Sequence, residues 1–154
     1  MFELPKNFFL VKGDAEGYSP LNAFDSALLK SGIGNTNLIK VTSIIPPGSK
    51  HIRPKKAYPG SLLPCAYSYK ISDIPGEIIS ACVCVALPEE ESAPGVIMEF
   101  SSTGRKDLAE EIVKKMAEEA MNIRGLKIKK MFVTSVQHRV RKIGCVFAGV
   151  VLWG

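Results

Sequence analysis

The sequence predicts an α+β domain with one or two largely antiparallel sheets and helices packed outside them. Predicted strands outnumber predicted helices, and most of the segments that connect them are short. The 154 residues suit a single domain, and with 46% apolar and 23% charged residues the composition is that of an ordinary globular protein. No run of 18 apolar residues occurs, so no membrane-spanning helix is expected.

The N-terminal third is predicted to fold as strand, helix and strand. Residues 8–13, FFLVKG, and 36–42, TNLIKVT, are typical of strands, and residues 19–35 between them predict a helix. Ser19 suits the N-cap of this helix and Pro20 its first position, where a missing N–H costs nothing. Either of two glycines can end the helix, Gly32 or Gly34.

Further strands and one long helix complete the chain. Residues 105–124 form the clearest helix, ended by Gly125, because apolar residues recur at helical spacing. These residues are Leu108, Ile112, Met116 and Ala120. The other strands are expected at 61–72, 77–87, 95–100, 126–138 and 144–153. The last of these is almost wholly apolar and should lie in the centre of a sheet.

An acidic residue interrupts the apolar stripe of the first helix. Asp25 occupies a position at helical spacing from the apolar residues that form the stripe. Those residues are Leu21, Phe24, Leu28 and Leu29. A carboxylate there either lies at the edge of the stripe and faces water, or is buried and needs a cationic partner. The pattern leaves both interpretations open.

Two more polar residues stand in predicted strands. Strand alternation puts Glu99 on one face with Ile97 in the apolar segment GVIMEF, and desolvation there would raise its pKa, as a general acid requires. A carboxylate at the end of the strand, facing water, is the alternative. Asn37 can both donate and accept hydrogen bonds, although its usual role just after a glycine-rich turn is structural.

The segment VTSIIPP, residues 41–47, ends the predicted strand at a pair of hydroxyl residues, Thr42 and Ser43. Two prolines follow Ile45, and this stretch is predicted not to pair as a strand. An ordinary loop is one interpretation. A backbone arranged for chemistry on itself is the other.

Several functional classes receive little support. The net charge of +5 comes from scattered basic residues without an aromatic-rich basic motif, so a solvated surface is favoured over a nucleic-acid partner. The four cysteines lack metal-ligand spacing and are expected to pack as small apolar residues, with Cys82 and Cys84 on one strand face. The N-terminus lacks the features of a signal peptide, so a cytoplasmic location and no membrane partner are expected.

Four stretches together resemble the pyruvoyl-dependent arginine decarboxylases. They are SPLNAFDSALLKSGIGNTNLIKVTSIIPP, PCAYSYKISDIPGE, GVIMEF and KIGCVFAGVVLW, and the similarity runs from about residue 9 to the end in the same element order. The resemblance implies a four-layer α/β-β/α sandwich. It also implies homotrimers, or larger assemblies of trimers, whose active sites lie between protomers.

The family resemblance implies that the chain cuts itself between Thr42 and Ser43, into residues 1–42 (the β chain) and 43–154 (the α chain). The Ser43 hydroxyl attacks the Thr42 carbonyl, and elimination and hydrolysis then turn residue 43 into a pyruvoyl group. This covalent group replaces pyridoxal phosphate as the electrophile, and no metal is expected. The product of arginine decarboxylation, agmatine, feeds polyamine synthesis in archaea.

The resemblance also implies roles for individual residues. Glu99 matches the family's proton donor, and Asn37 a residue needed for processing. Substrate-binding positions are Asp25, which matches the carboxylate that pairs with the guanidinium of L-arginine, together with Leu28 and Gly34. An extended strand would place Asn37 about 20 Å from Ser43 of its own chain, so a neighbouring protomer's Asn37 is expected to serve each site.

Two other functions remain as alternatives at this point. The chain could be a pyruvoyl decarboxylase of another amino acid, such as histidine. It could also be a non-enzyme, either an unprocessed trimeric scaffold or a basic nucleic-acid binder. A non-enzyme would have no need to cut itself, so self-cleavage separates this class from the decarboxylases.

Overall fold

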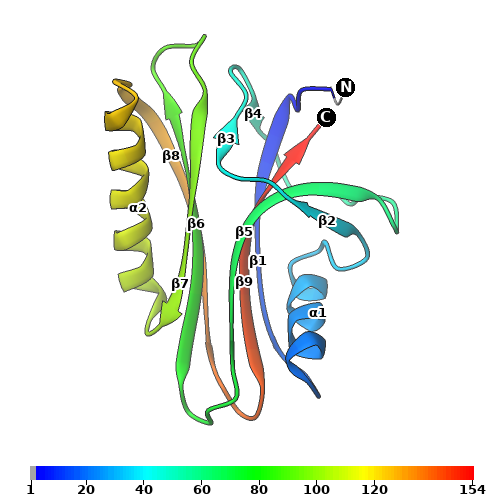
Figure 1. The fold of residues 1–154 in the computed structure, drawn as a ribbon. Helices are drawn as coiled ribbons and strands as arrows, with labels where there is room; N and C mark the ends of the chain where they lie inside the picture. Colours follow the sequence, from blue (N-terminus) through cyan, green and yellow to red (C-terminus); the bar gives the residue numbers. More distant parts are fainter. Residues whose placement is uncertain (1–2) are drawn as a thin grey trace.

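The fold consists of two β-sheets packed face to face, with one helix on the outer side of each (Figure 1). The computed structural model describes residues 3–154. The four layers are α1, a five-stranded sheet, a four-stranded sheet and α2, which confirms the predicted α+β sandwich. No helix within this range is long and apolar enough to span a membrane.

The five-stranded sheet has the order β2-β5-β9-β1-β4. Its strands are β2 (Asn37–Lys40), β5 (Leu62–Ser72), β9 (Gly144–Trp153), β1 (Asn7–Glu16) and β4 (Lys50–His51). The short edge strands β2 and β4 pair in parallel with their neighbours, and the long strands pair antiparallel. As predicted, the apolar C-terminal strand β9 lies in the centre.

The four-stranded sheet has the order β3-β7-β6-β8 and is antiparallel throughout. Its strands are β3 (Ile44–Ile45), β7 (Gly95–Thr103), β6 (Ile78–Pro88) and β8 (Ile128–Arg139). The helix α2 (Lys106–Ile123) covers its outer face. Cys82 and Cys84 both point toward α2, as strand alternation predicts, and burial raises the pKa of Cys82 to about 12. All four cysteines are buried and free, so the prediction of packed thiols is confirmed.

Local capping rules account for the ends of α1 (Pro20–Lys30). The Ser19 side chain accepts a hydrogen bond from the Asn22 N–H at 3.1 Å, and Pro20 occupies the first turn. Gly32 adopts φ of 88°, a conformation that favours glycine, and it therefore stops the helix where the sequence predicted a stop.

The predicted buried faces of both helices were wrong in part. In α1, Leu21 is 75% exposed and Leu29 is 50% exposed, and in α2 both Leu108 and Ile112 are exposed. Leu28 and Ala120 of the predicted stripes are buried, and the other buried residues are mostly small: Ala23 and Ala27 in α1, and Ala109, Val113, Ala117 and Met121 in α2. Small side chains let a helix approach the sheet closely: a Cβ on Gly13 of β1 would lie 2.3 Å from the Ala27 carbonyl oxygen.

Between residues 40 and 50 the chain crosses from one sheet to the other and back again. It leaves the five-stranded sheet after β2, pairs briefly with the four-stranded sheet as β3, and returns as β4. The predicted strand 36–42 therefore ends early, and the prediction that Ile44 and Ile45 do not pair was wrong. Both residues precede the prolines, so their backbone N–H groups remain available for pairing with β7.

Candidate active site

Residues 41–43, here called the crossing segment, join the two sheets. The Val41 N–H donates to the Cys65 carbonyl of β5 at 3.1 Å, and the Ile97 N–H of β7 donates to the Ser43 carbonyl at 2.7 Å. The two hydrogen bonds attach the first and the last residue of the segment to different sheets. The peptide bond between Thr42 and Ser43 therefore spans the gap between two fixed points, and Thr42 is exposed beside it.

Glu99 lies on β7, two residues beyond Ile97 and on the same inner face. Its side chain is 29% exposed, and burial raises the pKa of the carboxyl group, with the Lys40 ammonium opposing that rise. The atom Oε2 is buried and has no hydrogen-bond partner among residues 3–154. The expectation of a carboxyl group in apolar surroundings with a raised pKa is confirmed.

Lys40, the last residue of β2, is the close charged neighbour of Glu99 and was not predicted from the sequence. Its Nζ lies 3.8 Å from Glu99 Oε1 and donates to the Tyr67 carbonyl oxygen at 3.4 Å. The same ammonium lies 4.6 Å from the centroid of the Tyr67 ring. Nothing local in the sequence indicates the contact between Lys40 and Glu99, because the two residues are 59 positions apart in the chain.

Asn37 lies at the other end of β2, exposed, and its Nδ2 donates to the Gly60 carbonyl oxygen at 3.2 Å. The amide is therefore engaged away from the crossing segment of its own chain. Within residues 3–154, no N–H or O–H group donates a hydrogen bond to the Thr42 carbonyl oxygen.

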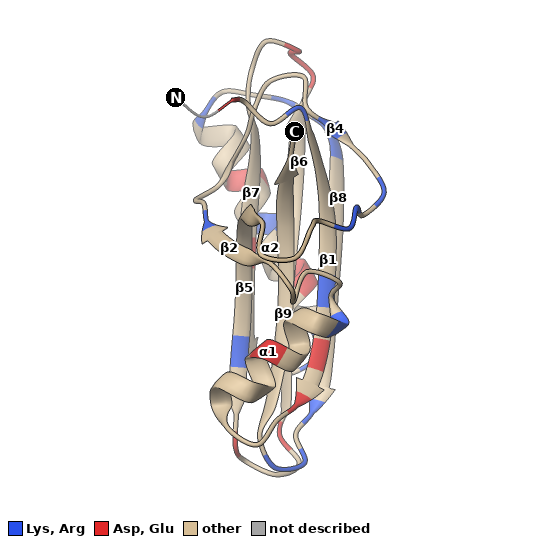
Figure 2. Cartoon of the chain, turned by 90° about the vertical axis from the view of Figure 1, so that its right-hand side faces the viewer, with Lys and Arg blue, Asp and Glu red and all other residues tan. Residues whose placement is uncertain are grey.

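The three substrate-binding candidates, Asp25, Leu28 and Gly34, lie on or just after α1. This helix covers the outer side of the five-stranded sheet (Figure 2). Asp25 is exposed, so within one protomer the interpretation as an edge carboxylate that faces water holds, and the interpretation as a buried carboxylate does not. Leu28 is only 8% exposed and packs against the sheet. Gly34 follows the helix so closely that a Cβ on it would lie 2.6 Å from the Leu29 nitrogen. No described hydrogen bond or ion pair joins Asp25 to Ser43 or Glu99.

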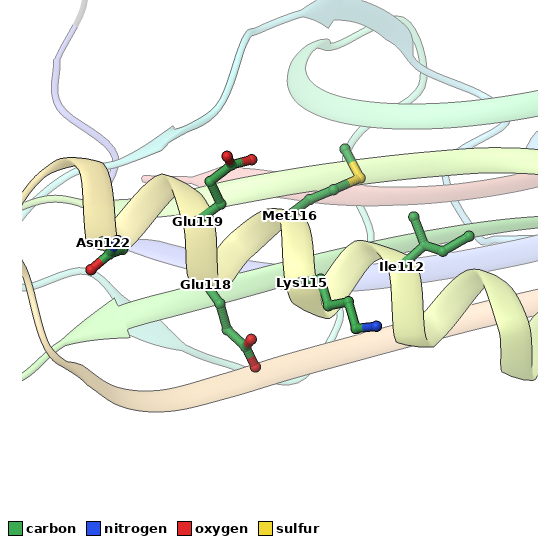
Figure 3. Close-up of a pocket in the computed structure, with 6 residues that line it drawn as sticks. All are labelled: Ile112, Lys115, Met116, Glu118, Glu119 and Asn122. Atoms are coloured by element: carbon green, nitrogen blue, oxygen red, sulfur yellow. The ribbon is translucent and has the colours of Figure 1, made fainter.

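A shallow hollow lies on α2 (Figure 3). It is lined by Ile112, Lys115, Met116, Glu118, Glu119 and Asn122. Because α2 covers the outer face of the four-stranded sheet, this hollow is separated by that sheet from the inner face that carries Glu99. It therefore contributes nothing to the candidate site.

Comparisons with known proteins identify the family of the chain. The family model described as pyruvoyl-dependent arginine decarboxylase matches residues 7–153. A protein of that name from Methanocaldococcus jannaschii is 46% identical over 152 residues, which cover 99% of this chain and 92% of the relative. Proteins of the same name from Methanococcus maripaludis (45% identical, covering 99% and 93%) and Pyrococcus furiosus (43% identical, covering 97% and 96%) are similarly close. The chain therefore belongs to the pyruvoyl-dependent arginine decarboxylase family.

Proposed function

We propose that the chain cuts itself between Thr42 and Ser43 and that the cut protein decarboxylates L-arginine to agmatine and carbon dioxide, in support of polyamine synthesis. The observation that carries this proposal is the crossing segment, whose hydrogen bonds to Cys65 and Ile97 hold the proposed bond between two sheets. Glu99 lies two residues beyond Ile97 on the adjoining strand β7, and burial raises the pKa of its carboxyl group. Family membership supports both steps.

The cleavage uses atoms of the chain alone, apart from one water molecule. The Ser43 Oγ attacks the Thr42 carbonyl carbon, the C–N bond breaks, and the amide becomes an ester. Loss of the α-proton of residue 43 then breaks the bond between Cβ and the ester oxygen. This step leaves a carboxylate on Thr42 and dehydroalanine at position 43. Water hydrolyses the dehydroalanine to a pyruvoyl group and ammonia is released.

Position 43 suits a pyruvoyl group. Ser43 is half-buried, its carbonyl is fixed by Ile97, and the unpartnered Glu99 Oε2 belongs to the same strand as Ile97. Once formed, the pyruvoyl ketone supplies the electrophile that takes up the substrate amine and accepts the electron pair left by carbon dioxide. Burial raises the pKa of the Glu99 carboxyl group and so favours its protonated form, and in this proposal Glu99 delivers a proton to the substrate α-carbon.

A complete site requires more than one protomer in this proposal, and we propose a trimer. Asn37 lies at the start of β2 and its amide bonds the Gly60 carbonyl oxygen, so an Asn37 from a neighbouring copy polarises the Thr42 carbonyl during cleavage. Asp25 is exposed in the single chain and free to meet a guanidinium at such a contact. Leu28 and Gly34 shape this binding region through packing. Leu28 is buried, and Gly34 has no side chain, so the backbone can lie close to Leu29.

Asp25→Asn is expected to lower kcat/KM for arginine by about 100-fold or more. A planar guanidinium can bond both oxygens of a carboxylate, and losing one partner of a desolvated pair costs about 3–5 kcal/mol, where each tenfold is ~1.4 kcal/mol. If Asp25 stays exposed in the assembly, the loss is only about 0–1 kcal/mol. The magnitude therefore reports whether a neighbouring protomer covers Asp25.

The measurement is agmatine and carbon dioxide production from arginine, ornithine, lysine and histidine by cleaved protein. Asp73→Asn, which removes an exposed carboxylate in the turn after β5, is the matched control and should leave the arginine preference unchanged. A wild type that prefers histidine, or an Asp25→Asn variant that keeps its arginine preference, would show that Asp25 does not select the substrate.

A further inference from the structure

We propose that Lys40 is a positioning residue, which holds the Glu99 carboxyl group through Oε1 at the junction of the two sheets and leaves Oε2 to carry the proton that is delivered. This inference rests on the proposed role of Glu99 as proton donor. It adds a residue to the site that acts on the donor and does not itself touch the reacting atoms.

The ammonium group of Lys40 contacts two residues, Tyr67 and Glu99, and its side chain is 54% exposed. Nζ donates to the Tyr67 carbonyl oxygen at 3.4 Å, lies 4.6 Å from the Tyr67 ring centroid, and lies 3.8 Å from Glu99 Oε1. Tyr67 belongs to β5 and Glu99 to β7, so the ammonium group joins the two sheets. A flexible lysine side chain held by a carbonyl and a ring gives the carboxyl group a defined partner direction.

The two oxygens of Glu99 have different surroundings. Oε1 faces the ammonium group, and Oε2 is buried without a partner in the described protomer. A cation beside one oxygen favours negative charge there, so the proton of the neutral acid belongs on the other oxygen. Lys40 thereby orients the acidic O–H away from itself.

The charge of Lys40 also sets how readily Glu99 changes its protonation state. The titratable groups that interact electrostatically with Glu99 are the ammonium of Lys40 from β2 and the thiol of Cys65 from β5, which packs on the α1 side of the five-stranded sheet. Burial raises the pKa of Cys65 to about 12, so this thiol is neutral near neutral pH. Desolvation raises the pKa of Glu99 and Lys40 opposes the rise. An acid that must give up a proton and regain one in every turnover needs a pKa that neither effect shifts too far.

The proposed cleavage would place Lys40 and Glu99 on different fragments. Lys40 belongs to residues 1–42, and Glu99 belongs to residues 43–154. The proton donor of the larger fragment is then oriented by the smaller one. The fragment 1–42 then keeps a role after cleavage, because its Lys40 orients Glu99 of the other fragment.

The first test follows kcat against pH for cleaved wild type, Lys40→Met, Lys40→Arg and the control Lys114→Met, which removes an exposed lysine from α2. Removing the cation raises the pKa of Glu99, and the active form is protonated, so the fall in kcat on raising the pH should move to higher pH in Lys40→Met. The maximal kcat should drop by roughly 10- to 100-fold because the acid is misplaced. Lys40→Arg should restore the pH profile, and the control should match wild type.

The second test does not depend on activity. In Ser43→Ala protein, the Glu99 carboxyl carbon is titrated by ¹³C NMR, with Glu99→Gln identifying its signal. A titration midpoint that moves to higher pH in Lys40→Met and returns in Lys40→Arg supports the inference even if no arginine is decarboxylated. An unchanged midpoint overturns it while leaving the proposed function intact. A raised KM at unchanged kcat also overturns it, because Lys40 would then bind substrate instead.

Discussion

Ser43→Ala protein is expected to remain a single chain and to produce no agmatine. The proposed cleavage needs an oxygen on the β-carbon of residue 43, both to attack the Thr42 carbonyl and to leave in the elimination. Alanine has no oxygen on its β-carbon, so neither the attack nor the elimination can occur and no pyruvoyl group can form. Because Ser43 is half-buried and bonded through its backbone carbonyl to Ile97, the substitution should leave the fold intact. Denaturing gel electrophoresis and a decarboxylation assay measure both outcomes.

Thr42→Ala is the matched control for this variant. Thr42 is exposed and supplies only its carbonyl carbon to the reaction, so its hydroxyl is not required. The alanine variant should still be cut and still be active. Cleavage of Ser43→Ala at the same bond would refute serine attack as the origin of the two fragments.

Glu99→Gln should be cut normally and then turn over arginine about 100- to 10,000-fold more slowly, the usual contribution of a general acid. Glutamine keeps the shape and the half-buried position on β7 but has no proton of suitable acidity to give. In the wild type, kcat should fall as the pH rises through the Glu99 pKa, which burial places above its ordinary value. That fall should be absent from the residual activity of the variant.

The measurement for Glu99 is single-turnover decarboxylation by protein whose cleavage has been verified beforehand. Glu111→Gln, an exposed position on α2, is the control for loss of one carboxylate and should behave as wild type. A cleaved Glu99→Gln protein with near-normal turnover would remove Glu99 from the proton-donor role.

Local sequence signals predicted those parts of the fold that depend on neighbours in the chain. Ser19 and Pro20 begin α1 by satisfying or omitting N–H groups of its first turn. Strand alternation placed Glu99 with Ile97 on one face, and Cys82 with Cys84 on another. The apolar run of β9 marked a strand covered on both sides, and it lies in the centre of its sheet.

Features that depend on pairing between distant segments were missed. The buried faces of the helices were misjudged because periodicity does not show that alanine faces such as Ala23 and Ala27 permit the closest approach to a sheet. The pairing of β3 with β7 escaped prediction because the prolines dominate the local pattern. The contact between Lys40 and Glu99 follows from that pairing, so no periodic pattern could have indicated it.

The mass spectrum of purified wild-type protein, kept at the growth temperature of its source, tests the central claim most directly. The account predicts two polypeptides, residues 1–42 and 43–154, in equal amounts. The larger one should be lighter, by one ammonia, than a fragment that begins with serine, because its first residue is a pyruvoyl group. It should also resist Edman degradation, since it has no free N-terminal amine. A single intact chain of 154 residues after prolonged incubation, or a larger fragment that begins with an ordinary serine, would contradict the account.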